Sequence, residues 1–239
     1  MFVHIRIEHS QTANMGTTQS QNSEIENGNE VEVVKLPYNC NTILREADSS
    51  SPADLQQLYH QLCDGVYLNH KKKKYWVEKK SNTNCFLLFA RDLLITWDDD
   101  DRFWHWYCPS NEMIEVSELL NICWLEIHGN FDTRNLSPNI LYEAAFMVML
   151  KDPAYGWEVP VNLRLTLPNG TKQQHKQNLA EKPRGQWIEI PAGEFFTSPE
   201  NVGPMEISLY EYEGGKWKRG LVIKGIIIRP KNYALNIDP

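Results

Sequence analysis

From about residue 84 onward, the chain consists of short segments in which apolar and polar residues alternate. The segment 161–167 (VNLRLTL) alternates over its whole length and ends at Pro168-Asn169-Gly170, a strong turn sequence. The segment 140–150 carries Glu143 as its only charge, so a strand buried on both faces is expected there. Similar strand character recurs in 84–90, 93–97, 205–210 and 221–229. Many short strands with hardly any helix predict an all-β fold, an antiparallel β-sandwich of jelly-roll type.

The residues before this region have a different character. Residues 10 to about 30 are polar, with little to bury, and predict disorder. Ser51 and Pro52 predict the N-cap and first turn of a short helix over 52–64, on which Leu55, Leu58, Tyr59 and Leu62 share one face. The helix is amphipathic, so it packs either on the main domain or on a partner.

A run of four lysines, Lys71–Lys74, follows this helix. It is expected to be a solvated connector, with a nuclear-import signal as the alternative. We therefore predict a variable extension over residues 1–74, a β domain over 75–231 and a short tail over 232–239.

Composition excludes several classes of protein. The net charge of −7 over 239 residues argues against a general nucleic-acid binder. The five cysteines (40, 63, 85, 108 and 123) form no C-x-x-C pair, which argues against a zinc ribbon and favours a reduced, intracellular protein. No apolar run is long enough to span a membrane. The common hydrolase, zinc-protease and nucleotide-binding motifs are missing, and the histidines are scattered, so we expect a binding protein without catalysis, cofactor or metal.

The stretch 95–106 (ITWDDDDRFWHW) holds three tryptophans and four successive aspartates. If 93–97 and 102–107 form a hairpin around the aspartates, then Trp97, Trp104 and Trp106 lie on one face, with Trp97 nearest the loop. Trp106, the deepest, is expected to belong to the core, whereas Trp97 at a charged rim is hard to place there. An exposed indole suits a sugar ring, because the C–H groups of the ring stack on it while carboxylates accept from the hydroxyls.

The aspartates Asp98–Asp101 allow three other interpretations. A calcium loop would need alternating ligands, which four successive aspartates do not provide. A glycosidase would need two separated carboxylates, one of them buried enough to stay protonated. A solvated polar turn accounts best for Asp99 and Asp100.

Several short blocks together resemble the phloem protein 2 (Nictaba-like) family of plant lectins. The blocks occur in family order over about residues 75–231: ARDLLITW (90–97), FWHW (103–106), CWLEIHG (123–129), QWIEI (186–190), GEFF (193–196), WKRGLVIKG (217–225) and IRP (228–230). The resemblance implies a β-sandwich that binds N-acetylglucosamine oligomers, chitin fragments and N-glycan cores, with neither catalysis nor a metal. It assigns ligand binding to Trp97, Trp104 and Glu211, and more weakly to Trp106.

The resemblance also implies partners and a location. A homodimer is expected, in the cytoplasm of phloem sieve elements or companion cells, with a nucleocytoplasmic location as the alternative. Disulfides with phloem filament protein are compatible with the five cysteines, and RNA is a weaker candidate partner. The alternative function is therefore a phloem structural or interaction protein that binds little sugar. Residues 1–70 show no F-box pattern, which leaves a ubiquitin-ligase role, common in the family, without support in this sequence.

Overall fold

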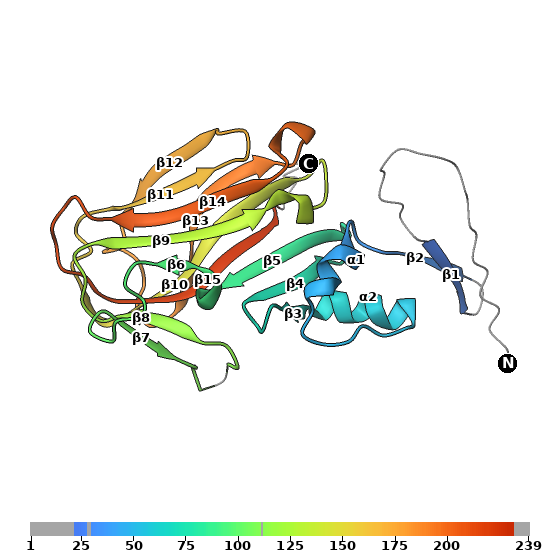
Figure 1. Ribbon diagram of the computed structural model, residues 1–239, viewed down its shortest axis with the longest axis horizontal. Coiled ribbons are helices and arrows are strands. Elements are labelled where there is room, and N and C mark those ends of the chain that lie inside the picture. Colours follow the sequence, from blue (N-terminus) through green and yellow to red (C-terminus); the bar gives the residue numbers. More distant parts are fainter. Residues whose placement is uncertain (1–21, 28–29, 111, 232–239) are drawn as a thin grey trace, which may run out of the picture.

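Two antiparallel β-sheets pack face to face and form the body of the molecule (Figure 1). The computed structural model describes residues 22–27, 30–110 and 112–231, with side chains from residue 35 onward. The five-stranded sheet has the order β12-β11-β14-β9-β6 and comprises β6 (Leu94–Ile95), β9 (Leu125–Asp132), β11 (Val161–Thr166), β12 (Lys172–Gln177) and β14 (Pro204–Glu211). The predicted all-β antiparallel sandwich is confirmed.

The other sheet has eight strands. Its main path runs β13-β10-β15-β5-β4-β3, while β8 pairs with β15 and β7 pairs with β8. The strands are β3 (Val66–Leu68), β4 (Lys73–Glu78), β5 (Thr83–Phe89), β7 (Trp104–Tyr107), β8 (Val116–Leu119), β10 (Leu141–Tyr155), β13 (Trp187–Phe196) and β15 (Arg219–Pro230). Short 3₁₀ helices occur at Leu44–Glu46, Ala90–Asp92, Thr133–Asn135 and Pro199–Asn201.

The alternation read from the sequence produces the core between the sheets. In β11, Leu163 and Leu165 are buried, whereas Arg164 and Thr166 on the other face are partly exposed. Gly129 lies on the inner face of β9, where a Cβ would come 2.4 Å from Cδ1 of Ile226 in the opposite sheet. A glycine at this position therefore allows the two sheets to approach closely.

The strand and turn predictions for the sandwich hold, except that only Leu94–Ile95 of the predicted strand 93–97 forms a strand. The segment 140–150 lies in β10, which runs on to Tyr155. Pro168-Asn169-Gly170 connects β11 to β12, and the Gly170 N–H donates a 2.9 Å hydrogen bond to the Leu167 carbonyl. Gly170 has a φ of 85°, a conformation that glycine adopts without strain.

The N-terminal segment packs on the sandwich and shares its core. It contains α1 (Cys40–Ile43) and α2 (Leu55–Asp64), and Leu58 and Leu62 of α2 belong to the main apolar cluster. The helix predicted from residue 52 in fact begins at Leu55. The carboxylate of Asp54 accepts from the Gln57 N–H at 2.8 Å and so caps the helix, which leaves Ser51 and Pro52 outside it. The predicted end at residue 64 is confirmed, with Gly65 as the C-cap.

The lysine run is not a connector throughout. Lys73 and Lys74 begin β4, which pairs with β5, so the boundary predicted at residue 74 falls inside a strand of the eight-stranded sheet. Lys73 also approaches Asp92 at 3.7 Å. An aliphatic lysine stem covers apolar surface while its ammonium group stays near water, which makes lysine compatible with a strand.

Asn84, fully buried in β5, ties the N-terminal segment to the sandwich. Its amide nitrogen donates to the carbonyls of Tyr38 (2.7 Å) and Asn135 (2.8 Å), and its amide oxygen accepts from the Tyr75 hydroxyl (2.9 Å). The Tyr142 hydroxyl donates to the backbone carbonyl of Asn84 at 2.9 Å. A buried amide with its groups satisfied fixes a unique arrangement of the segments that it joins.

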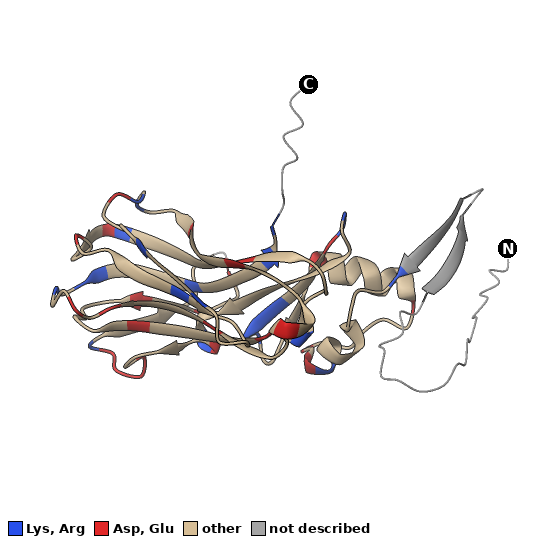
Figure 2. Cartoon of the chain, turned by 90° about the horizontal axis from the view of Figure 1, so that it is seen from above, with Lys and Arg blue, Asp and Glu red and all other residues tan. Residues whose placement is uncertain are grey.

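Part of the stretch predicted to be disordered is a strand. β1 (Asn22–Asn27) pairs with β2 (Glu30–Lys35), whereas residues 10–21 and the tail 232–239 lie outside the described residues. None of the helices in the described ranges has the length and apolar character needed to cross a membrane. Figure 2 shows the basic positions scattered among the acidic ones along the sandwich.

Candidate functional site

Trp97 is displayed on a turn that connects the two sheets. The predicted hairpin between 93–97 and 102–107 is wrong, because β6 pairs with β9 and β7 pairs with β8. The chain between them makes successive turns: the Asp98 N–H donates to the Ile95 carbonyl (3.3 Å), and the Phe103 N–H to the Asp100 carbonyl (2.9 Å). These turns carry the chain from the five-stranded sheet to the eight-stranded sheet.

The backbone of Trp97 is left-handed, with a φ of 61°. This conformation is rare and strained for a large side chain, at a cost of about 1–3 kcal/mol. Its indole is nevertheless 47% exposed and makes a tilted contact with Phe103, with 5.4 Å between ring centroids. The sequence interpretation of Trp97 as a rim residue is therefore consistent with its exposure. A strained backbone that presents an apolar ring to solvent indicates a function for that ring.

Trp104 and Trp106 stabilise the turn through hydrogen bonds from their indole N–H groups. The indole N–H of Trp104 donates to the carbonyl of Thr96 (3.0 Å), and that of Trp106 donates to the carbonyl of Asp98 (2.9 Å). These two carbonyls flank Trp97 on either side. Each such bond stabilises the turn by about 0.5–1.5 kcal/mol. One fixes the peptide group that precedes Trp97 and the other fixes the peptide group that follows Asp98.

The three tryptophans therefore have different environments. Trp104 is completely buried and presents no ring face to solvent, in contrast to the platform expected from the hairpin. Trp106 is half-buried, and the guanidinium of Arg91 lies 3.6 Å from the centroid of its ring. Since the chain crosses between sheets here, the indoles do not line up on one face. Only Trp97 among the three presents a largely free ring.

The four aspartates differ in their electrostatics. Hydrogen bonds from the Arg102 side chain lower the pKa of Asp100 to about 2, and the shortest of these is 2.6 Å. Partial burial, and secondarily the charge of Asp99, raises the pKa of Asp98. The carboxylate of Asp100 is thus occupied by its ion pair with Arg102. Asp98 directly follows Trp97 in the turn. In the described part of the chain, no cluster of three or more His, Cys, Asp or Glu is arranged to hold a metal ion.

Glu211 lies away from this turn and is buried. At the end of β14 it forms an ion pair with Lys218, which is itself fully enclosed. Glu211 also accepts from the Gly214 N–H (2.7 Å), and Lys218 donates to the carbonyls of Cys123 (3.1 Å) and Lys216 (2.9 Å). The direct ligand contact expected for Glu211 does not fit this burial; its contacts instead hold the loop 212–217 in place.

An aromatic row on the outer face of the five-stranded sheet escaped the sequence analysis. Trp124 stacks on Tyr212 with 4.5 Å between centroids, and Tyr212 stacks on Tyr210 at 5.5 Å. The guanidinium of Arg164 lies 5.2 Å from the Tyr210 ring. The signal was present as alternation, since residues 124, 126 and 128 and residues 210 and 212 all point to one face. The two segments lie far apart in sequence, so alternation alone does not predict that they are neighbours.

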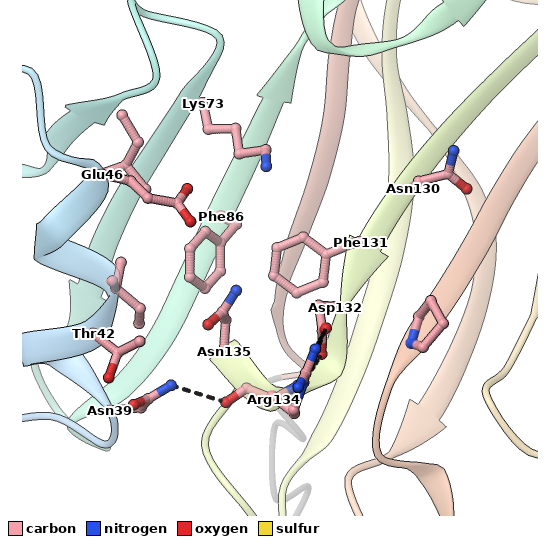
Figure 3. A pocket seen from close by; sticks show the side chains of 13 residues that line it. Asn39, Thr42, Glu46, Lys73, Phe86, Asn130, Phe131, Asp132, Arg134 and Asn135 are labelled. Atoms are coloured by element: carbon pink, nitrogen blue, oxygen red, sulfur yellow. Dashed lines mark hydrogen bonds and ion pairs between the residues drawn. The ribbon is translucent and has the colours of Figure 1, made fainter.

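A cavity of about 560 Å³ lies between the N-terminal segment and the sandwich (Figure 3). It is lined by polar side chains such as Asn39, Lys73 and Arg134, together with Phe86 and Phe131. Arg134 pairs with Asp132 beside it, and the two phenylalanine rings are almost wholly buried. The cavity therefore offers no exposed ring for stacking, unlike the turn at Trp97.

All five cysteines are free thiols. Cys40 and Cys85 are buried and Cys63 and Cys123 half-buried, which leaves Cys108 as the exposed one. Burial raises the pKa of Cys40 and raises that of Cys85 to about 12, which suppresses the reactive thiolate. A disulfide with filament protein stays a prediction, and within the variable segment Cys63 is more accessible than Cys40.

Sequence comparison shows the relationship directly. The profile of the family described as "Phloem protein 2" matches residues 83–230. The chain belongs to the phloem protein 2 family. It is 49% identical over 204 residues to the protein PHLOEM PROTEIN 2-LIKE A1 of Arabidopsis thaliana, covering 83% of this chain and 82% of the relative. It is also 44% identical over 203 residues to a protein of Luffa acutangula named "Lectin", covering 83% and 96%.

The family match confirms the resemblance read from the sequence blocks. It contains the turn with Trp97, the Glu211–Lys218 pair and the aromatic row, while β3, β4 and α2 precede it. Among solved structures, the CBM22-1 xylan-binding domain of Paenibacillus barcinonensis Xyn10C is similar with a TM-score of 0.32 and 12% identity, over 59% of this chain and 87% of that domain. A likeness at this level carries no argument about the ligand.

Proposed function

We propose that this member of the phloem protein 2 family is a carbohydrate-binding lectin that recognises N-acetylglucosamine oligomers and the core of N-glycans. The observation that carries the proposal is the display of Trp97, whose indole is 47% exposed on a left-handed backbone held by two indole hydrogen bonds. The name of the Luffa relative, "Lectin", supports the same class of ligand.

The chemistry of the turn fits a pyranose ring. The C–H face of the sugar stacks on Trp97, and Phe103 supports the indole from the side. Asp98 is the acceptor that we assign to the sugar hydroxyls, because it directly follows Trp97 in the chain. Asp100 is already engaged by Arg102. Hydrogen bonds to an ionised acceptor are stronger than neutral ones, so one carboxylate contributes substantially in a small site.

Trp104 and Trp106 act by positioning Trp97 rather than by touching sugar. Their N–H groups fix the carbonyls at residues 96 and 98, so the binding ring is organised before the ligand arrives. Preorganisation lowers the entropy lost on binding. A single exposed ring still gives modest affinity, and a homodimer or a multivalent glycan would raise it through avidity.

A glycan array with the recombinant chain tests the proposed class of ligand. The proposal expects signals on chitooligosaccharides and N-glycan cores that excess chitotriose removes, and none on galactose- or glucose-terminated glycans. If the protein instead retains filament protein or RNA and chitotriose does not compete, the alternative of an interaction protein is correct. We propose no catalytic step. The phloem location stays a prediction.

A further inference from the structure

The row formed by Trp124, Tyr212 and Tyr210 ends in an exposed ring. Trp124 is 43% exposed although one of its faces is covered by Tyr212, with 13° between the two planes. The remaining exposure must therefore come from the opposite face and the ring edges. At the other end of the row, the guanidinium of Arg164 covers the ring of Tyr210. The side chain of Gln174 also donates to the Tyr210 hydroxyl at 3.0 Å.

The orientation of Trp124 is fixed by a chain of polar contacts. Its indole N–H donates to Oε2 of Glu126 (3.0 Å), whose Oε1 lies 3.1 Å from Nε2 of His128. Nδ1 of His128 lies 3.1 Å from the Ser208 hydroxyl. The hydrogen bond from Trp124 is the main cause that lowers the pKa of Glu126, so this carboxylate stays ionised at neutral pH. The exposed indole is therefore fixed by a hydrogen bond of its own N–H and by stacking on Tyr212.

Trp97 and Trp124 lie at the same end of two paired strands. β6 and β9 are antiparallel, with Ile95 opposite Ile127, and the Thr96 N–H extends the pairing by donating to the Glu126 carbonyl at 3.1 Å. Trp97 follows Thr96, and Trp124 precedes Glu126 by two residues. The backbones of the two tryptophans are thus separated by about one to two strand spacings, roughly 5–10 Å. Both rings are exposed at the end of the sheet where the acidic turn lies.

We infer that Trp124 is a second stacking ring of the sugar site, which takes a further pyranose of an oligomer whose first ring lies on Trp97. The inference rests on the function proposed above. The occupant is a β-linked N-acetylglucosamine oligomer, because a monosaccharide stacked on Trp97 leaves the second indole unused. The role of Trp124 is therefore to set the preference for oligomer length.

Calorimetric titration of the full chain with N-acetylglucosamine and with chitotetraose tests the inference. The wild-type protein should bind chitotetraose at least tenfold more tightly than N-acetylglucosamine. Trp124→Ala should keep the affinity for N-acetylglucosamine within twofold and lose most of the gain for chitotetraose, while Trp124→Phe, which retains a ring, should recover part of it. Phe196→Ala removes an exposed ring from β13 in the other sheet and should change neither affinity.

The outcomes separate the two proposals. If Trp124→Ala binds chitotetraose as the wild type does, or loses both sugars equally, then the second stacking ring is refuted while the lectin function stands. If the wild-type protein binds neither sugar, then the proposed function itself is refuted. Thermal melting of each variant shows whether a loss of binding follows from unfolding.

Discussion

The indole N–H of Trp104 donates a 3.0 Å hydrogen bond to the carbonyl of Thr96, although the ring of Trp104 is completely buried. The bond joins the core of the sandwich to the peptide group immediately before Trp97. A buried residue thereby determines the position of an exposed one. The same arrangement recurs at Trp106 and Asp98, so the turn is held on both sides of the displayed indole.

Trp104→Phe tests this link. The substitution keeps most of the ring but removes the N–H donor, which leaves the Thr96 carbonyl without its partner. We expect a loss of about 1–3 kcal/mol in the free energy of unfolding, measured by urea denaturation. Binding of chitotriose to the folded protein should weaken at least fivefold, because Trp97 is no longer held in place. If chitotriose binding by the folded variant equals that of the wild type, the positioning role is refuted.

The ion pair of Glu211 with Lys218 predicts a purely structural phenotype. Glu211→Gln leaves a buried ammonium group without its counter-charge, which costs about 3–5 kcal/mol in stability. Replacing both residues, as in Glu211→Leu with Lys218→Met, should restore much of the loss, because no unpaired charge remains. The affinity of the folded Glu211→Gln protein for chitobiose should match that of the wild type. A specific loss of chitobiose binding without loss of stability would instead place Glu211 in contact with the sugar.

The raised pKa of Asp98 predicts an acid-sensitive affinity. Its ionised form accepts from the sugar in our proposal, so affinity should fall as the pH drops through that pKa, which lies above the ordinary value of about 3.9. Titration of chitotriose between pH 7 and pH 4 measures this fall. Asp98→Asn should bind more weakly at pH 7 and show no such pH dependence. A fall of the same size in Asp98→Asn would assign the dependence to another group.

The raised pKa of Asp98 also affects the stability of the folded protein. A carboxyl whose pKa is raised on folding destabilises the folded state at pH values above that pKa, and the cost disappears below the unfolded pKa. Asp98→Asn should therefore raise the melting temperature at pH 7 and leave it unchanged near pH 3. An increase of equal size at both pH values would show that charge is not the cause.

The sandwich could be predicted from sequence because its signals are local. Alternation in 161–167 and the turn at 168–170 each specify their own structure, and both are confirmed. The family blocks gave the same architecture and were confirmed by the family match. The helix start failed for a local reason as well, since Asp54 competes with Ser51 as a cap and its carboxylate accepts from the Gln57 N–H.

The candidate site was predicted only in part because its contacts are not local. From the sequence, Trp97, Trp104 and Trp106 are predicted to lie on one face of a hairpin, because a hairpin is the simplest way to pair two adjacent strand-like segments. Their true partners, β9 and β8, come later in the chain. Likewise, the burial of Glu211 depends on Lys218 across a loop, and the stacking of Trp124 depends on Tyr212 in a distant strand.

The most direct test of the account is calorimetric titration of chitotriose into Trp97→Asn, accompanied by thermal melting. Asparagine tolerates the left-handed backbone at position 97, so the relief of strain offsets the lost contact with Phe103. The account predicts no detectable binding and a melting temperature within about 3 °C of the wild type, which corresponds to roughly 1 kcal/mol. Wild-type affinity in Trp97→Asn would contradict the central claim that this displayed indole holds the sugar.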